Sequence, residues 1–586
     1  MSNFIKLYDL LANYQKHFAK DVMVAGRSNN SWKTYSTDEF ITIVDQLSRG
    51  MLAKGLQKGD RVAIMSGNRP EWNMVDFACN QIGLAVVPLY PTLSNQDLIY
   101  IMNDAEVKLL FTSNEELAQK ADMALKENNL SLELYTFDEI PGRQSFHEVI
   151  ELGSTESVDL EPFRDAVKSE DLLTLIYTSG TTGKPKGVFL THLNIISNVS
   201  ACNHLVNSEF KKALSFLPLC HIFERMVVYL YLSKGVQIYY VENLDNIVQD
   251  INEVKPDLFT TVPRVLEKVF DKIVDKGKNL TGIKKSLFFW ALNLGLKYQE
   301  PAKNSGWYNL QLNIARKLIF SKWKEALGGN IKLIISGGAA LQERLARVFW
   351  AADIKVLEGY GLTETSPVIA VNSYKAEDVK FGSVGRVLKN LDVKIASDGE
   401  ILVKGPSITI GYYKNEEATK EAIDAEGYFH TGDIGELTSD GFLRITDRKK
   451  EMFKTAGGKY VAPQVLENKL MESTLIAQVM VVGENQRFPA ALIVPAFEEL
   501  EKYCQHKGIP YTSKEEAIKQ EEVLAKYEQI ISQANSNFGQ WEKIKKFRLL
   551  ANDWTINAGE LTPKLSLKRK VIYQKNEQII QGIYSE

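Results

Sequence analysis

Short apolar runs of strand length alternate with helical patterns through the first three quarters of the chain. Such runs favour buried β-strands, and strands that alternate with helices are typical of α/β layers around largely parallel sheets. We therefore predict an α/β fold for this part of the chain. The clearest strand-like runs are residues 61–65, 85–89, 108–111 and 332–335.

The pattern changes between residues 264 and 330, where apolar side chains recur at helical spacing opposite a lysine-rich face. We predict a helical insertion there. Within it, residues 287–296 form a nearly unbroken apolar run of ten residues, well short of the ~20 that a membrane-spanning helix requires. Two readings stay open for this run: a core helix, or a peripheral membrane contact assisted by Lys284 and Lys285.

Beyond the insertion the pattern indicates antiparallel strands. Residues 393–395 and 400–403 flank a turn at Asp398 and Gly399. An Asp-Gly turn between two apolar segments is a strong hairpin signal, so we predict a β-hairpin at this point.

A charged stretch at residues 447–451 separates this region from a compact C-terminal segment. We interpret the stretch as a hinge between a large domain of residues 1–447 and a smaller, mobile α+β domain of residues 448–586. The smaller domain contains strand-like runs at residues 478–482 and 490–494.

The bulk composition is that of a soluble globular protein, with 45% hydrophobic residues, 24% charged residues and a net charge of −3 over 586 residues. This length favours several folding units. The charge balance argues against nucleic-acid binding, which usually requires a basic face. Four scattered cysteines indicate reduced thiols, and the N-terminus lacks the pattern of a secretory signal. We expect a cytoplasmic protein.

The strongest chemical signal is the loop that follows the apolar run at residues 172–177. Residues 178–187 combine hydroxyl side chains with three glycines and two lysines, which suits a triphosphate because glycines expose backbone N–H groups and lysines neutralise the anion. It is not a Walker loop, because Pro185 replaces the second glycine and neither Lys184 nor Lys186 precedes Ser or Thr. A flexible polar hairpin is the alternative.

This loop resembles the nucleotide-binding loop of the adenylate-forming superfamily, which includes acyl-CoA synthetases, peptide-synthetase adenylation domains and luciferases. Four further segments resemble motifs of the same superfamily in the same order. They are the PxxH segment at residues 217–225, in the form seen in long-chain fatty acid ligases, the adenine and magnesium motif at 359–365, the ribose motif at 431–433 and the hinge at 447–451.

The resemblance implies activation of a carboxylic acid by ATP. A carboxylate resists attack by a thiol, so it first attacks the α-phosphate, pyrophosphate leaves, and a mixed anhydride remains. The long-chain branch then transfers the acyl group to coenzyme A. We therefore expect ATP, Mg²⁺ and coenzyme A as cofactor and co-substrates, with a long-chain fatty acid of roughly fourteen to eighteen carbons buried in the protein.

The same resemblance assigns the nucleotide site. Glu364 is expected to bind Mg²⁺ with the Thr178 hydroxyl near it, which suits a hard ion that bridges phosphates. Asp433 is expected to accept both ribose hydroxyls, and Arg448 to contact ribose or phosphate. For Gly338 a purely geometric role in a strand-to-helix turn stays open. The other expected nucleotide contacts are Ser179, Gly180, Thr181, Thr182, Gly183, Lys184, Ala339, Tyr360, Gly361 and Thr363.

The resemblance also assigns residues to the acyl junction and to the lid. His221 is expected to line the junction of the fatty carboxylate and the adenylate, with a satisfied core histidine as the alternative. A carboxylate nucleophile has no proton to lose, so His221 is not a general base. Two half-reactions require two lid positions, with Lys450 as the pivot and Gly458 beside the pantetheine arm.

The C-terminal segment departs from the family pattern. Long-chain ligases carry a catalytic lysine where this chain has Ser566. In an extended segment, residues two apart face the same way, so either Lys564 or Lys568 can replace it. We favour Lys564, and solvated surface lysines are the alternative.

These motifs predict a long-chain fatty acid:CoA ligase. A ligase that loads a carrier protein and a non-catalytic lipid-binding homologue are the rival interpretations. The expected partners are the fatty acid and coenzyme A, and not nucleic acid. Peripheral attachment to the inner face of a membrane and a homodimer are left open.

Overall fold

The computed structural model describes residues 4–28, 31–128, 132–178, 184–536, 538–555, 558–561 and 567–585. The chain forms two compact units. The first unit contains residues 1–394, 402–431 and 438–443, and the second contains residues 395–401, 432–437 and 444–586. A single domain boundary at residues 447 and 448 stays a prediction.

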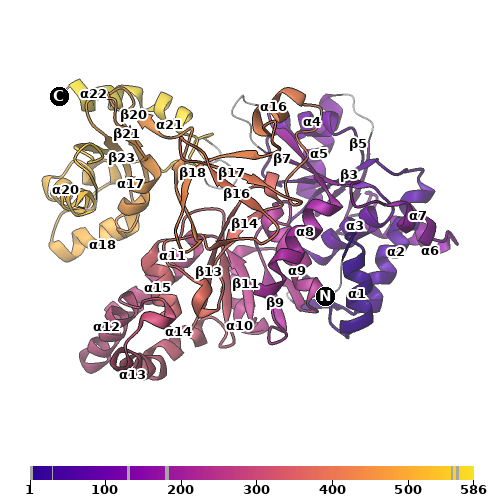
Figure 1. Cartoon of the computed structure of the whole chain (residues 1–586), viewed down its shortest axis with the longest axis horizontal. Coiled ribbons are helices and arrows are strands. Elements are labelled where there is room, and N and C mark those ends of the chain that lie inside the picture. The colour runs from indigo at the N-terminus through magenta and orange to yellow at the C-terminus, as the bar shows by residue number, and fades with distance from the viewer. Residues whose placement is uncertain are drawn as a thin grey trace. The chain divides into compact units, whose positions relative to one another are not determined.

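A six-stranded sheet in the first unit carries the strand that leads into the predicted phosphate loop (Figure 1). The strands from β6 to β7 are parallel, and β8 is antiparallel to β7. Strands β3 and β4 coincide with their predicted runs, because a strand covered on both faces is apolar almost throughout. In sheet order the strands are β6 (Glu133–Thr136), β5 (Val107–Thr112), β3 (Arg61–Met65), β4 (Ala85–Leu89), β7 (Leu172–Thr178) and β8 (Lys186–Thr191).

A nine-stranded sheet is the second layer of strands in the first unit. Its central strands, from β13 to β1, are parallel, while β2, β14 and β15 pair antiparallel at the edges. The predicted α/β fold with largely parallel sheets is therefore confirmed. In sheet order the strands are β15 (Arg386–Val387), β14 (Val368–Val371), β13 (Lys355–Gly361), β12 (Leu333–Ser336), β11 (Leu258–Thr261), β9 (Lys212–Ser215), β10 (Gln237–Tyr240), β1 (Val24–Ser28) and β2 (Ser31–Tyr35).

Three helices, α3 (Pro70–Gln81), α8 (His192–Cys202) and α9 (Ile222–Ser233), lie between these sheets (Figure 1). Helix α3 contacts β4 in one sheet and β1 in the other, and all of its residues are buried. This layer therefore joins the two sheets into one core. The other helices around them are α1 (Asp9–Phe18), α2 (Thr37–Ala53), α4 (Asn95–Asp104), α5 (Glu115–Glu127), α6 (Phe146–Thr155), α7 (Glu161–Ala166), α10 (Ile247–Val254), α15 (Glu343–Ala351) and α16 (Glu416–Ala422).

The predicted helical insertion is confirmed. It comprises α11 (Pro263–Lys278), α12 (Gly282–Leu296), α13 (Gly306–Ala315), the π-helix η4 (Arg316–Phe320) and α14 (Ser321–Ala326).

Helix α12 contains the apolar run of residues 287–296, and five of its ten residues are buried. A Cβ atom at Gly277 would lie 2.0 Å from the Phe288 ring, and this ring also lies beside Trp323. This packing favours the core-helix reading, and a membrane contact through this run stays a prediction. Among the described residues, no helix is long and apolar enough to cross a membrane.

A four-stranded sheet has the order β16-β17-β18-β19. Strands β16 (Asp392–Ile395) and β17 (Glu400–Lys404) form the predicted hairpin, in which Gly399 adopts a φ of 87° and the Ala396 N–H donates to the Glu400 carbonyl. The remaining strands are β18 (Phe429–Leu437) and β19 (Leu443–Arg448).

The second unit has its own hydrophobic core. Strand β22 is antiparallel to β23, and β24 is parallel to β23. The strands at residues 478–482 and 490–494 are thus confirmed. The elements are β20 (Phe453–Lys454), β21 (Tyr460–Val461), α17 (Pro463–Leu470), β22 (Ile476–Val482), β23 (Ala490–Pro495), α18 (Phe497–Lys507), α19 (Lys514–Ala517), α20 (Glu521–Asn535), β24 (Lys546–Leu549), α21 (Arg569–Lys575) and α22 (Glu577–Ser585).

Candidate active site

The predicted phosphate loop is the tip of the hairpin formed by β7 and β8. Thr178, the last residue of β7, pairs with Lys186, the first residue of β8. A strand rather than a helix follows the loop, and Pro185 disfavours a helix there because proline lacks a backbone N–H. The loop residues Ser179, Gly180, Thr181, Thr182 and Gly183 lie outside the described residues.

Tyr412 connects the predicted magnesium carboxylate to this hairpin. Glu364 lies in a short 3-10 helix, η5 (Thr363–Thr365), that contacts β8. Glu364 is 9% exposed, and its Oε1 accepts a hydrogen bond of 3.0 Å from the Tyr412 hydroxyl. The Lys186 ammonium lies 5.3 Å from the centroid of the same tyrosine ring. Glu364, Tyr412 and a lysine of the phosphate-loop hairpin therefore form one cluster.

The segment that carries Tyr412 is held along β8. The Thr409 hydroxyl donates to the Phe189 carbonyl at 2.6 Å, and the Thr409 N–H donates to the Glu364 carbonyl at 2.7 Å. Burial, reinforced by the charge of Glu364, raises the pKa of Tyr412, so the phenol stays protonated and donates. Tyr412 was not predicted from the sequence, because the residues around it, including Gly411, do not indicate a contact with Glu364.

The predicted adenine wall lies at the carboxyl ends of two neighbouring parallel strands. Ser336 at the end of β12 pairs with Glu358 in β13, so the glycine loop after Ser336 and the aromatic ring of Tyr360 start from the same sheet edge. The Leu341 N–H donates to the Glu358 carboxyl group at 3.2 Å and fixes the loop. Burial raises the pKa of Glu358 to about 8, which keeps negative charge away from this edge at neutral pH.

The small residues at this edge have local geometric reasons. Gly338 adopts a φ of 81°, a region that favours glycine, and Ala339 beside it is exposed. A Cβ atom at Gly361 would lie 1.7 Å from the Pro367 carbonyl oxygen. Thr363 is 6% exposed in η5. Geometry accounts for both glycines, so nucleotide contact at these positions stays a prediction.

His221 caps helix α9 beside the glycine loop. Its Nδ1 accepts the Phe223 N–H at 3.1 Å, so the neutral ring carries its proton on Nε2. A Cβ atom at Gly337 would lie 3.0 Å from the Phe223 ring, which places the start of α9 against the loop. The cap explains where α9 begins. The predicted contact of His221 with the acyl junction stays a prediction.

Behind His221, Arg225 ties α9 to two other elements. It forms a fully buried ion pair with Asp76 of α3, and its Nη1 donates to the Thr174 hydroxyl of β7 at 2.8 Å. Tyr229 also donates to Asp76. A buried ion pair is tolerated when its remaining polar atoms are hydrogen-bonded, as they are here. The network fixes α9 against the strand that leads into the phosphate loop.

In the second unit the two predicted ribose residues lie together. The Arg448 Nε is 3.4 Å from the Asp433 Oδ1, because these residues lie on the neighbouring strands β19 and β18. The Asp433 side chain is 7% exposed and that of Arg448 is 57% exposed. The Lys449 ammonium lies 2.7 Å from Glu400, which accepts the Gly432 N–H at 2.9 Å and so fixes the turn before Asp433.

The predicted hinge and lid residues lie on the surface of the second unit. Lys450 is exposed after β19, and Gly458 has a φ of 74° in the turn between β20 and β21. Lys568 is exposed at the N-cap of α21. Lys564 and Ser566 lie outside the described residues. The roles given to all of them stay predictions.

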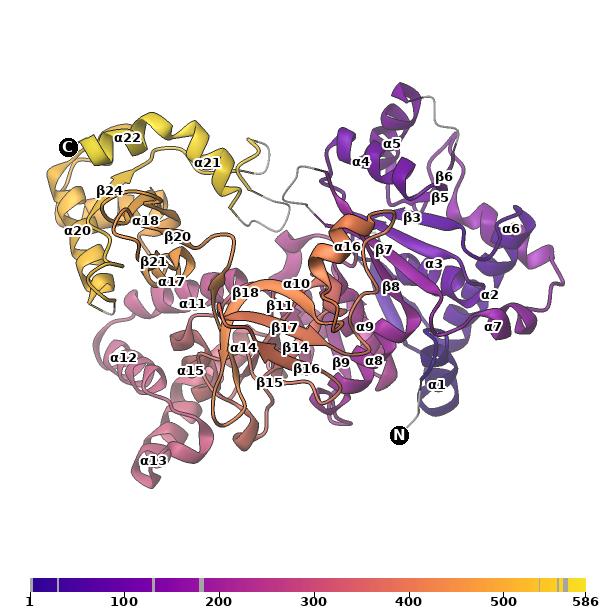
Figure 2. The same ribbon diagram turned by 45° about the horizontal axis from the view of Figure 1, so that its top comes forward.

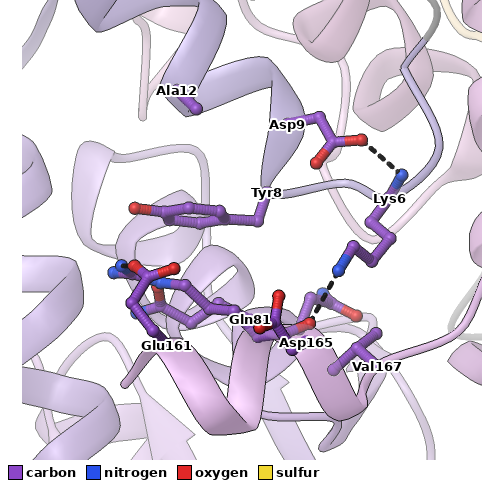
Figure 3. A pocket seen from close by; sticks show the side chains of 10 residues that line it. Lys6, Tyr8, Asp9, Ala12, Gln81, Glu161, Asp165 and Val167 are labelled. Carbon is purple, nitrogen blue, oxygen red and sulfur yellow. Dashed lines mark hydrogen bonds and ion pairs between the residues drawn. The ribbon is translucent and has the colours of Figure 1, made fainter. Parts of the chain in front are cut away.

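A pocket of about 190 Å³ lies elsewhere, between α1, α7 and the end of α3. Arg164 stacks on the Tyr8 ring at 4.2 Å, and the Lys6 ammonium donates to the Arg164 carbonyl. Figure 3 shows Tyr8 and Lys6 at this pocket. The pocket contains none of the predicted site residues. The contacts around this pocket join the N-terminal helix α1 to α7. The pocket does not belong to the candidate active site.

Comparison with protein families gives two matches. Residues 12–413 match the family described as AMP-binding enzyme, and residues 451–586 match the AMP-binding enzyme C-terminal domain. The long-chain-fatty-acid–CoA ligase FadD15 of Mycobacterium bovis is 34% identical over 95% of this chain and 93% of its own length. The human long-chain-fatty-acid–CoA ligase 1 is 31% identical over 99% of this chain and 88% of its own length.

Solved structures agree on the fold. The adenylation domain of a carboxylate reductase from Mycobacterium chelonae superposes with a TM-score of 0.78 at 20% identity, over 99% of this chain and 91% of that one. An o-succinylbenzoate CoA synthetase from Bacillus subtilis, in complex with its acyl-adenylate intermediate, gives a TM-score of 0.68 at 20% identity, over 96% of this chain and 97% of that one.

Proposed function

The chain belongs to the AMP-binding enzyme family, and from that premise we propose that it is an ATP-dependent long-chain fatty acid:CoA ligase. The structural observation that supports this most directly is the cluster in which Tyr412 contacts both Glu364 and Lys186 at the phosphate-loop hairpin. It joins a carboxylate for a divalent cation to a cation for phosphate.

The reaction has two steps. A carboxylate oxygen of the fatty acid attacks the α-phosphate of ATP, the bond to the β-phosphate oxygen breaks, and diphosphate leaves. The sulfur of coenzyme A then attacks the acyl carbon, AMP leaves with the bonding electron pair, and the thiol proton is lost. The protein has to position these groups and stabilise the charge on phosphorus.

The first unit supplies the phosphate and adenine contacts in this proposal. Lys184, Lys186 and the backbone of the loop neutralise the β and γ phosphates. Glu364 and the Thr178 hydroxyl offer the hard oxygen ligands that suit Mg²⁺, which supplies charge neutralisation on the phosphates when bound. The adenine fits the small-residue edge formed by Gly338, Ala339, Tyr360, Gly361 and Thr363.

The second unit supplies the ribose and lid contacts in this proposal. Asp433 accepts the ribose hydroxyls, and Arg448 holds ribose or phosphate. Lys450 is the pivot between the two half-reactions, and Gly458 leaves room for the pantetheine arm. Lys564 or Lys568 reaches the carboxylate during adenylation.

His221 and its capped helix form the wall beside the fatty carboxylate. The Phe223 N–H donates to Nδ1, so the neutral ring carries its single proton on Nε2. This nitrogen can donate a hydrogen bond to the acyl carbonyl oxygen. It does not remove a proton, because the attacking carboxylate has none.

The metal assignment is tested by Glu364→Gln. The substitution keeps a hydrogen-bond acceptor for Tyr412 but removes the charge, so we expect pyrophosphate release to fall by at least about tenfold, which is ~1.4 kcal/mol. Palmitate binding, measured by equilibrium dialysis, should stay unchanged. Glu377→Gln, at an exposed position of the same unit, is the control. Pyrophosphate release within threefold of wild type would show that Glu364 is not the metal ligand.

We also propose a cytoplasmic protein that attaches peripherally to a membrane and assembles as a homodimer. The fatty acid substrate partitions into bilayers, which gives such attachment a purpose. Equilibrium sedimentation tests the dimer: a single species of monomer mass across micromolar concentrations would exclude it.

A further inference from the structure

Four large apolar side chains form an exposed stripe on the helical insertion. Trp307 is 71% exposed, Leu310 52%, Ile314 47% and Leu318 50%. They follow one another at spacings of three, four and four residues along α13 and η4. At ~100° per helical residue this spacing confines them to an arc of roughly 80°. We call these four residues the apolar stripe.

The opposite face of the same helices is anchored in the first unit. The Tyr308 hydroxyl donates to the Leu294 carbonyl of α12 at 2.7 Å, and the Arg316 Nε donates to the Ala351 carbonyl of α15 at 2.8 Å. Leu312 and Phe320 are buried. The exposure of the apolar stripe is therefore fixed by packing and is not the result of a frayed helix. Both views show α13 at the outer end of the insertion (Figure 1 and Figure 2).

The surroundings of the apolar stripe are strongly basic. Residues 275–325 contain ten lysines and arginines and three acidic residues, in a chain whose net charge is −3. Lys278, Lys303 and Lys322 pair with these three carboxylates, and the other seven cations exceed them. Lys317 is exposed between Ile314 and Leu318, and Lys284 and Lys285 are exposed at the start of the neighbouring α12. A lysine keeps its ammonium in water while its alkyl stem lies along an apolar surface.

We propose that the apolar stripe is the surface by which this protein lies on an anionic lipid bilayer. Single exposed apolar residues are ordinary, but an aligned row with a tryptophan and a basic border is the pattern of a helix that lies in the membrane interface. The basic border matches the negative surface of anionic lipids. The inference rests on the membrane attachment proposed above, and it names the surface responsible.

The positive charge around the apolar stripe favours a bilayer, rather than a second copy of the chain, as the partner of this surface. Two copies facing each other through this stripe would bring two strongly basic segments together, which is unfavourable. Anionic headgroups instead neutralise the lysines while the four side chains enter the acyl boundary.

The test compares two double variants in vesicle flotation. The first carries Leu310→Ser and Ile314→Ser, and the second carries Met123→Ser and Val248→Ser, which alter residues of similar exposure outside the insertion. With vesicles of phosphatidylcholine and phosphatidylglycerol, we expect the first variant to lose at least tenfold in partitioning and the second to match wild type. Vesicles of phosphatidylcholine alone should bind all three proteins weakly.

Tryptophan quenching by brominated lipids locates the contact independently of any folding defect. Trp307→Phe should abolish the quenched component, whereas Trp541→Phe, at another exposed tryptophan, should retain it. Equal flotation of wild type and the first double variant, or quenching that survives Trp307→Phe, would overturn the proposal. The proposal would also be overturned if the wild-type protein bound no vesicles and the first double variant lost a dimer that the wild type forms, because the stripe would then be a dimer interface.

Palmitoyl-CoA formation in vesicle-free buffer is measured on the same samples. If the wild-type protein ligates palmitate but does not float with vesicles, the membrane-surface proposal is wrong and the proposed function stands. A protein that floats through Trp307 but forms no palmitoyl-CoA contradicts the proposed function alone.

Discussion

At the scale of single residues, the site depends on contacts that sequence spacing does not reveal. Tyr412 reaches Glu364 across 48 residues, and no local pattern signals that contact. Motifs report which residues are present, whereas hydrogen bonds between distant segments depend on how the strands pair. The motif residues can be identified in the sequence, although their roles stay predictions, whereas the hydroxyl that donates to Glu364 cannot.

Tyr412→Phe tests that orientation. A hydrogen bond to a charged group contributes ~1.5 kcal/mol or more, so its loss should weaken magnesium-dependent pyrophosphate release roughly tenfold. The measurement is the Mg²⁺ titration of pyrophosphate release with palmitate. Tyr413→Phe, which removes a neighbouring hydroxyl, is the matched control. If the two variants give the same titration, the Tyr412 hydrogen bond does not orient Glu364.

Glu224 gives a pH dependence of stability. Its carboxyl is fully buried next to Thr260, and burial raises its pKa from 4.5 to about 7. The folded state binds the Glu224 proton more tightly than the unfolded state does. This contribution to the unfolding free energy is complete below pH 4.5 and is lost as the pH rises through 7. Its size is about 3 kcal/mol, from 1.36 kcal/mol per pKa unit.

We therefore expect Glu224→Gln to flatten the loss of unfolding free energy between pH 5 and pH 8.5, measured by urea denaturation of the full chain. Glu377→Gln, an exposed position, should keep the wild-type slope. A wild-type slope in Glu224→Gln would contradict the raised pKa of Glu224.

At the scale of elements, burial on both faces is what made strands predictable. Strands β3 and β4 match their apolar runs because parallel strands covered by helices are apolar throughout. The same reasoning left two readings open at residues 287–296, since an apolar run does not show which neighbour covers it. Trp323 packs against both Phe270 and Phe288, and the exposed stripe lies on the next helix.

The C-terminal segment before α21 carries the prediction about the missing family lysine. Lys564→Ala should sharply slow formation of palmitoyl-adenylate while it spares thioester formation from supplied palmitoyl-adenylate, because only the first step needs a cation beside the α-phosphate. Lys570→Ala, at an exposed position of α21, is the control. Wild-type adenylation by Lys564→Ala, Lys568→Ala and the double variant would mean that no lysine here is catalytic.

At the scale of the whole molecule, the chain forms two compact units, and the predicted single boundary at residues 447 and 448 stays a prediction. The segments 395–401 and 432–437 belong to the second unit although the first unit continues on both sides of each. Linear patterns favour one boundary because a charged stretch resembles a linker. A chain that crosses between units several times leaves no such mark in composition.

The central claim is that this protein makes a fatty acyl-CoA through an acyl-adenylate. The most direct measurement is pyrophosphate release from ATP with palmitate, with and without coenzyme A, followed by mass detection of the product. The account predicts pyrophosphate and palmitoyl-AMP without coenzyme A, palmitoyl-CoA and AMP with it, and far lower efficiency with butyrate. Absence of pyrophosphate release would contradict it, as would palmitoyl-AMP that coenzyme A leaves unconverted.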